Sequence, residues 1–192
     1  MSPDEALISA IESADLAGVQ RALAAGANPN VDVDPELQPM VGTGRSLLHM
    51  AMVRRQIESP AAKAELLHIM RALLEAGAEA DRASCAEMVL NNLSFSDTPL
   101  NHAAAVGDAD AVRLLLECGA HPAGLSLSGR PPNAQVYCTA LHRAAENDDP
   151  EIARLLLAAG ADGNVPGIGG ITPLRIALGR HHTRVAEVLG AV

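Results

Sequence analysis

The sequence predicts an all-α protein, a solenoid of about five stacked helix pairs in a single domain. The main support for this fold class is a short phrase that recurs along the chain. The phrase reads SLLH at 46–49, TPLNHAA at 98–104, TALHRAA at 139–145 and TPLRIA at 172–177. Such repetition is typical of folds in which each unit buries its apolar face against the next one.

A second phrase, which closes on Gly-Ala, ends four of the units. It reads LAAGANPN at 23–30, LLEAGAEAD at 73–81, LLECGAHPA at 115–123 and LLAAGADGN at 156–164. The spacing is constant, because 21 residues separate Glu5 from Gly26, Thr98 from Gly119 and Thr139 from Gly160. We therefore divide the chain into units at about 2–30, 46–81, 98–123, 139–164 and 172–192.

Each position of these phrases has a structural role. Thr can cap the first helix, Pro suits its first turn, and Gly suits the left-handed residue that ends the second helix. Alanine pairs such as 103–104 let neighbouring units approach closely, and leucine runs such as 114–116 supply the core. In the first unit, Ser2 and Glu5 have the spacing of a capping box, which predicts a helix that begins at Pro3.

The recurring phrase resembles the ankyrin repeat, whose signature contains T-P-L-H-x-A. The resemblance covers nearly the whole chain and implies two antiparallel helices and a hairpin loop in each repeat. It also implies that the His of the signature, here His49 and His142, holds the hairpin against the helix by hydrogen bonds. Asn101 and Arg175 replace that His in two repeats. Asn101 can still form local hydrogen bonds, whereas Arg175 is expected partly in solvent.

The links between the repeats are unusual in length. Residues 165–171 make a link of seven, which is the ordinary length, whereas 31–45, 82–97 and 124–138 contain fifteen, sixteen and fifteen. We expect these three to form lengthened β-hairpin fingers at one edge of the stack, and material inserted on one face of a solenoid often marks its binding face. The second repeat has ten extra residues near 57–63, which should lengthen one or both of its helices.

Charge limits the classes of partner. The formal net charge is −9, and residues 1–40 carry seven acidic side chains and one basic one, Arg21, for a local charge of −6. An acidic chain without a basic cluster argues against nucleic-acid binding, where contacts to phosphates supply most of the affinity. A partner protein with a basic surface suits the acidic N-terminal third better.

The sequence contains no targeting or membrane signal. The first residues are acidic and amphipathic, unlike a signal peptide, and no apolar run approaches the roughly 20 residues of a membrane span. The three cysteines form no disulfide framework, so we expect a cytoplasmic protein. Lys63 is the only lysine among many arginines, a bias that suggests a bacterial origin.

Catalytic motifs are missing from the sequence, which has no phosphate-binding loop and no nucleophile elbow. Four residues have types and short spacings that suit tetrahedral zinc: Cys118, His121, Cys138 and His142. Structural roles also explain them, since Cys118 stands where sister repeats carry Ala and His142 is the His of the signature. We therefore predict no enzyme, no metal and no cofactor, and a metal-binding or enzymatic protein remains the least favoured alternative.

The resemblance implies a scaffold for protein–protein interaction that binds a partner protein on its concave and finger face. The variable positions of the repeats and the fingers supply the predicted contacts: Met50, Arg54, Phe95, His102, Arg130, Tyr137, Arg143, Glu146, Asn147 and Arg180. Phe95 and Tyr137 are the only aromatic residues besides histidine. They serve either as interface anchors or as small cores of their own fingers.

We expect a monomer that binds another protein and neither nucleic acid nor membranes. The main alternative function is an immunity-type or regulatory inhibitor of an enzyme or toxin. In that case the acidic N-terminal third would meet a basic surface of the target.

Overall fold

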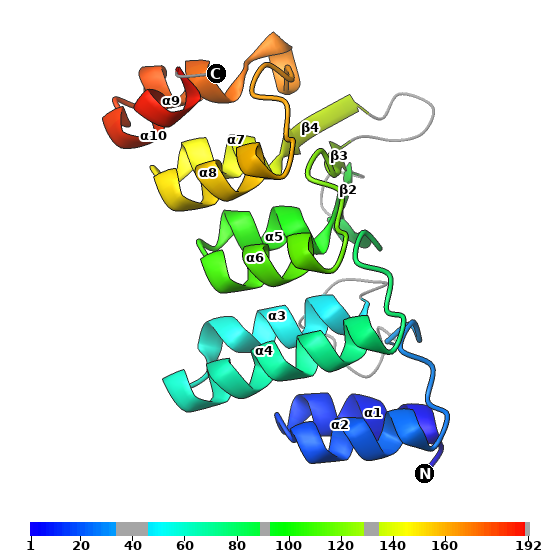
Figure 1. The fold of residues 1–192 in the computed structure, drawn as a ribbon. Coiled ribbons are helices and arrows are strands. Elements are labelled where there is room, and N and C mark those ends of the chain that lie inside the picture. The colour runs from blue at the N-terminus through cyan, green and yellow to red at the C-terminus, as the bar shows by residue number, and fades with distance from the viewer. Residues whose placement is uncertain (34–45, 89–92, 129–134, 191–192) are drawn as a thin grey trace.

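The computed structural model describes residues 1–33, 46–88, 93–128 and 135–190, with the backbone alone for the strand residues within 84–96 and 125–137. Ten α-helices occur in this part of the chain and pack as five antiparallel pairs (Figure 1). The pairs are α1 (Pro3–Glu12) with α2 (Leu16–Ala24), α3 (Leu47–Ile57) with α4 (Pro60–Glu75), α5 (Pro99–Ala105) with α6 (Ala109–Glu117), α7 (Ala140–Glu146) with α8 (Pro150–Ala158), and α9 (Pro173–Gly179) with α10 (Thr183–Leu189).

The helices form two rows. The first helix of each pair contacts the first helix of the next, from α1 to α9, and the second helices stack likewise from α2 to α10. We call these the first-helix row and the second-helix row. The result is an elongated stack with the two termini at opposite ends (Figure 1). The predicted all-α solenoid is confirmed.

Aliphatic side chains and alanines fill the space between the pairs. Leu115 and Leu156 occupy matching positions of α6 and α8, and both are fully buried. The alanines at 103–104 and 144–145 are also fully buried, which lets the first helices approach one another closely. A helix pair cannot cover these side chains by itself, so the stack shares one continuous core.

The helix ends follow the sequence signals. Ser2 Oγ accepts from the Glu5 amide at 3.1 Å, and a Glu5 carboxylate oxygen accepts from the Ser2 amide at 2.7 Å, which completes the capping box. Thr98 Oγ1 accepts from the Asn101 amide at 3.3 Å and caps α5 in the same way. Gly119, just after α6, has φ +89°, the left-handed conformation that ends a helix.

Two of the long links form β-hairpins, as predicted, but the hairpins also pair with each other. The four strands are β1 (Ser84–Met88), β2 (Leu93–Asp97), β3 (Leu125–Ser128) and β4 (Gln135–Thr139), antiparallel in the order β1-β2-β3-β4. The junction is β2 with β3, where Phe95 pairs with Ser128 and Ser96 with Leu127. Two of the expected fingers are thus joined into one small sheet at the edge of the stack (Figure 1).

The remaining two links are the long one over 31–45 and the short one over 165–171. The finger expected over 31–45 lies mostly outside the described residues, because 34–45 are not described. The short fourth link contains a 3₁₀ turn, η2 (Ile168–Gly170), which contacts β4.

The second repeat is lengthened in both helices, as its insertion predicted. α3 has 11 residues and α4 has 16, against 7 and 9 in α5 and α6. The added turns extend beyond α2 and α6 on the side away from the sheet (Figure 1). We call these added turns, at the end of α3 and the start of α4, the overhang. The helices of the neighbouring repeats do not extend this far, so the overhang depends on contacts of its own.

A buried ion pair ties the overhang to the third repeat. The Arg55 side chain is only 8% exposed, and its Nε and Nη2 donate to the two Asp108 carboxylate oxygens at 2.6 and 2.8 Å. Arg55 Nη1 also donates to the Lys63 carbonyl oxygen. The hydrogen bond to Asp108 raises the pKa of Arg55 above its ordinary value. Burial opposes the ionisation of Asp108, but the bonds from Arg55 and the Ala111 amide lower its pKa overall.

One signature histidine, His142, connects its repeat to the next link, as the resemblance implies. His142 Nδ1 accepts from the Thr139 amide at 3.1 Å, and Nε2 lies 3.0 Å from the Ile171 carbonyl oxygen in the next link. Because Nδ1 accepts, Nε2 carries the proton and donates to Ile171. Burial lowers the pKa of His142 below its ordinary value of 6.5, although the bond to Ile171 acts in the opposite direction.

Asn101, which stands at the signature His position of the third repeat, makes no such hydrogen bond to any described residue of the next link. Its side chain is fully buried, and neither Nδ2 nor Oδ1 has a hydrogen-bond partner among the described residues. The expectation that Asn101 forms local hydrogen bonds with its side chain is therefore wrong. The Asn side chain is shorter than that of His. In the fourth repeat, His142 occupies the same position and its imidazole reaches the next link.

The ion pair of Arg55 gives a first prediction. Asp108→Asn keeps a side chain that can cap α6 but leaves a buried guanidinium without its closest counter-charge, so the free energy of unfolding should fall by about 3 kcal/mol. Urea denaturation measures this loss. The matched control, Asp15→Asn, breaks the exposed pair with Arg21 and should cost less than about 1 kcal/mol. An equal fall in the free energy of unfolding for both variants would show that the buried ion pair stabilises the fold no more than the exposed one.

His142 gives a prediction of pH dependence. Its pKa is lower in the folded protein than in the unfolded chain, so the unfolded chain takes up a proton first as the pH falls. The stability should therefore decrease below about pH 6.5 and be fully present above it. His142→Asn, which copies the third repeat, should flatten this part of the curve in urea denaturation at a series of pH values. An unchanged slope would exclude His142 as the cause.

The orphaned amide of Asn101 gives a third prediction. Asn101→His restores the signature residue and a donor that can reach the next link, as His142 does. We expect a gain of about 1 kcal/mol in the free energy of unfolding, the usual net contribution of one hydrogen bond. Thermal and urea denaturation both measure it, and a loss of stability would mean that the third link has no acceptor within reach.

Candidate protein-binding surface

The first-helix row brings together six of the predicted contact residues. They lie near the ends of the first helices or in the turns that follow them: Arg54, His102, Arg143, Glu146, Asn147 and Arg180. Asn147 and Arg180 are exposed and the other four are half-buried. The repeat spacing explains this alignment, because equivalent positions of stacked units lie side by side.

At the C-terminal end of this row, Glu146 lies between two arginines. Arg143 Nη1 donates to Glu146 Oε2 at 3.1 Å, and Arg180 Nη2 lies 3.9 Å from Glu146 Oε1. Arg180 Nη1 also donates to the Glu146 carbonyl oxygen at 3.2 Å. Burial opposes the charge of Arg143, but Cys138 and Glu146 outweigh it and raise the pKa of Arg143. The guanidinium therefore stays charged while half-buried.

The middle of the row is also held by side-chain contacts. His102 Nε2 lies 2.6 Å from Gln56 Nε2, and the His102 ring meets the His49 ring edge-on at 6.1 Å between centroids. Asn147 Nδ2 donates to the Ala105 carbonyl oxygen at 2.8 Å, which ties the fourth repeat to the third. Arg54 Nη2 donates to Glu58 at 2.8 Å. These bonds fix the side chains before any partner arrives.

Four predicted contacts differ from the rest. Met50 is only 4% exposed and packs in the core, so its assignment to the contact surface is wrong; its α3 position faces neighbouring helices. Arg130 lies outside the described residues. Phe95 is on β2 and Tyr137 on β4, two strands of the sheet beside the row, and their side chains lie outside the described part of the structure.

A hollow of about 400 Å³ lies between α7 and α9, next to the short fourth link. We call it the α7–α9 groove, and its lining includes Ile171, Arg175, Ile176, Gly179 and Arg180. Sequence reasoning missed this groove as a site. The available signal was the departure of Arg175 from the His of the signature, which places a guanidinium where other repeats bury an imidazole or amide.

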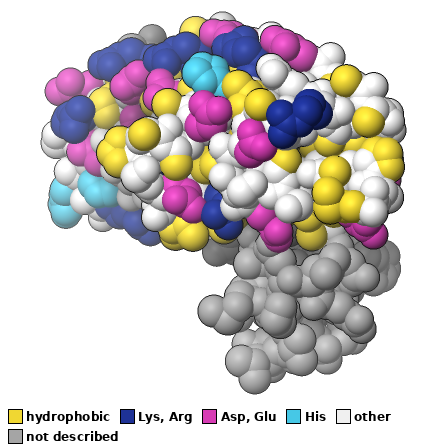
Figure 2. All heavy atoms as spheres, turned by 90° about the horizontal axis from the view of Figure 1, so that it is seen from below, with side chains coloured by type: hydrophobic (Ala, Val, Ile, Leu, Met, Phe, Trp, Pro, Cys, Tyr) yellow, Lys and Arg dark blue, Asp and Glu magenta, His cyan; other side chains and the backbone are white. Residues whose placement is uncertain are grey.

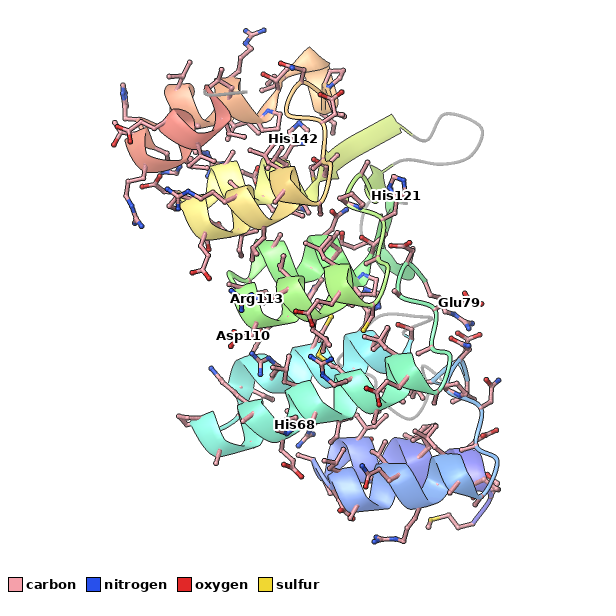
Figure 3. The ribbon with its side chains drawn as sticks, viewed as in Figure 1. His68, Glu79, Asp110, Arg113, His121 and His142 are labelled. Carbon is pink, nitrogen blue, oxygen red and sulfur yellow. The ribbon has the colours of Figure 1, made fainter. Side chains whose placement is uncertain are left out.

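The residues considered for zinc have separate structural positions. Cys118 follows the end of α6, where burial raises the pKa of its thiol, and Cys138 is buried on β4. Figure 3 shows His121 near β3 and His142 on α7, in different repeats. Within the described residues, no group of three or more His, Cys, Asp or Glu side chains could hold a metal ion.

One face of the molecule carries charges of both signs without large areas of a single sign. On the face shown in Figure 2, acidic and basic side chains are interspersed with small hydrophobic ones. The second-helix row contributes such pairs, since Arg113 contacts Asp110 at 3.2 Å and Glu151 at 3.0 Å (Figure 3 labels Arg113 and Asp110). None of the described helices is long and apolar enough to cross a membrane.

The acids near the N-terminus are largely occupied by local contacts. Asp4 accepts from the Asn28 amide at 2.7 Å, and Asp32 accepts from Arg82 at 2.8 Å. Glu5 belongs to the capping box. The bonds of Asp4 and Glu5 hold the first repeats in place without changing the charge of these carboxylates, whereas Arg82 offsets the charge of Asp32.

Comparison with known proteins supports one family. A sequence model described as Ankyrin repeats (3 copies) matches residues 60–167, more than half of the chain. The matched range includes both hairpins of the sheet and the helices from α4 to α8. No curated protein matches the chain.

Proposed function

Because this chain belongs to the ankyrin-repeat family, whose repeats form protein–protein interaction domains, we propose that it binds a partner protein on the first-helix row and the adjoining sheet. Such repeats are typically scaffolds without enzymatic activity. The proposed surface contains Arg54, Phe95, His102, Arg130, Tyr137, Arg143, Glu146, Asn147 and Arg180. We further propose that the protein acts as a cytoplasmic monomer.

The observation that carries this proposal is the fixed geometry of the row. Arg143, Glu146 and Arg180 form one connected cluster, and Asn147 is bonded to the backbone of the preceding repeat. Side chains that are already ordered lose little conformational freedom when a partner docks, so more of the contact energy appears as affinity. A stack of repeats also keeps the distances between these side chains constant.

The position of the sheet supports the same surface. β4 leads directly into α7, so Tyr137 is only a few residues from Arg143 in the chain and on the adjoining element. Aromatic residues near the centre of an interface often provide much of its binding energy. The pairing of β2 with β3 joins both fingers into one platform, so the strands that carry Phe95 and Tyr137 belong to the same sheet.

An inhibitor acting through the acidic N-terminal third receives less support. Asp4, Glu5 and Asp32 are already bonded within the first two repeats, as described above. A partner that bound there would have to compete with these contacts. The row is therefore the favoured surface, whether the partner is an enzyme, a toxin or another scaffold.

The test uses the full chain as bait in an extract of the source organism, followed by affinity measurement with the partner identified by mass spectrometry. The variants Arg54→Ala/His102→Ala and Tyr137→Ala should each weaken binding by about 1–3 kcal/mol, which corresponds to roughly five- to 150-fold. The control Arg71→Ala/Arg113→Ala changes the second-helix row and should leave the affinity unchanged. Equal affinity for wild type and for both test variants would refute this surface.

A further inference from the structure

The α7–α9 groove is open because little side-chain volume fills it. The link that passes over it, 165–171, is the short one, and Gly167 and Gly179 contribute no side chain to the lining. Gly179 stands at the repeat position that Glu146 holds in α7. A Cβ placed on Gly179 would meet no other atom within 4 Å, so the space above it is free.

The groove offers exposed aliphatic surface. Ile168 is 45% exposed and Ile171 is 41% exposed, both in the short link, and the half-buried Ile176 of α9 lies beside them. Most other large aliphatic side chains of the described residues are buried in the core. An apolar side chain from a partner would remove these isoleucines from water, which is favourable in proportion to the area covered.

The charge around the groove is opposite to that of the chain. Arg175 and Arg180 line it, and Arg143 lies at its edge, whereas Glu146 is the one carboxylate among the lining residues. Glu146 is already engaged by Arg143 and Arg180, and Arg175 has no acidic partner among the described residues. Two guanidinium groups thus line the groove together with one carboxylate, and a third arginine pairs with that carboxylate, on a protein whose net charge is −9.

From this combination we infer that the α7–α9 groove binds an acidic segment of the partner protein that carries an aliphatic side chain beside its carboxylates. The inference rests on the proposed function and names the chemistry of the partner at one end of that surface. The aliphatic side chain occupies the space above Gly179, against Ile171 and Ile176. A carboxylate accepts hydrogen bonds from Arg175, whose planar guanidinium suits two-point contact.

The acidic partner segment inferred for the groove differs from the basic partner surface that the amino-acid composition favours. The acidic first 40 residues favoured a basic partner, but the groove concentrates positive charge at the opposite end of the stack. A long-range attraction of net charges would bring a basic surface towards the N-terminal repeats. The short-range contacts in the groove select for carboxylates instead, because paired charges in a partly enclosed site interact more strongly than exposed ones.

The probe for the test is a displayed library of short random peptides, selected on the immobilised full chain. Peptides recovered should carry Asp or Glu next to Leu, Ile or Val. Synthetic versions, labelled with fluorescein, should bind in anisotropy titrations with an affinity that falls as salt is raised, since salt screens the arginine–carboxylate contacts. Recovery of no peptide, or only of peptides without acidic residues, would overturn the inference.

Two variants separate shape from charge. Gly179→Leu adds a side chain at a position where a Cβ meets no other atom within 4 Å, and Arg175→Glu reverses a charge of the groove. Each should weaken peptide binding by about tenfold or more. Arg154→Glu makes the same charge change on α8, away from the groove, and should leave binding unchanged. Circular dichroism checks that all three variants fold. Acidic peptides that bind Gly179→Leu and Arg175→Glu as well as wild type would overturn the assignment.

A failure of the groove inference can be told apart from a failure of the proposed binding surface. Loss of partner binding in Arg54→Ala/His102→Ala but not in Gly179→Leu would leave the first-helix row as the binding surface and refute the groove. A second copy of the chain is the other possible occupant. Sedimentation of the protein alone would reveal it as a mass that rises with concentration and returns to the monomer in Arg175→Glu, and this result would also overturn the inference.

Discussion

The whole structure depends on the burial of leucine and alanine side chains between neighbouring helix pairs. No pair can cover its own apolar face, so each repeat is stable only against the next one. Leu115 and Leu156 are buried by this stacking, and the paired alanines bring the first helices close together. The same stacking aligns equivalent positions of different repeats, and that alignment creates the first-helix row.

Polar contacts between repeats add specificity to this apolar core. The ion pair of Arg55 with Asp108 fixes an overhang that the regular repeat does not have, and His142 ties α7 to the following link. Buried polar groups are costly unless they are paired. Asn101, which is buried without a partner among the described residues, shows what the stack loses when the signature residue changes.

The surface chemistry follows from these structural constraints. In the first-helix row, side chains are bonded to one another or to a neighbouring backbone, so they present a defined pattern. The α7–α9 groove is lined by the short fourth link and by two glycines, while its charge comes from Arg180 at a variable position and from Arg175, which replaces the His of the signature. An acidic protein can in this way carry a local site for carboxylates.

The sequence by itself determined the repeats, the capping box of Ser2 and Glu5, and the lengthened helices of the second repeat, because these depend on residues close together in the chain. It also placed Arg143, Glu146 and Arg180 on one surface, since a regular period projects onto a regular stack. The tertiary structure alone decided the burial of Met50, the pairing of Phe95 with Ser128, and the contact of Arg55 with Asp108, 53 residues away. These features depend on which residues of different repeats meet, and that is set by packing and strand register between units that no local pattern encodes.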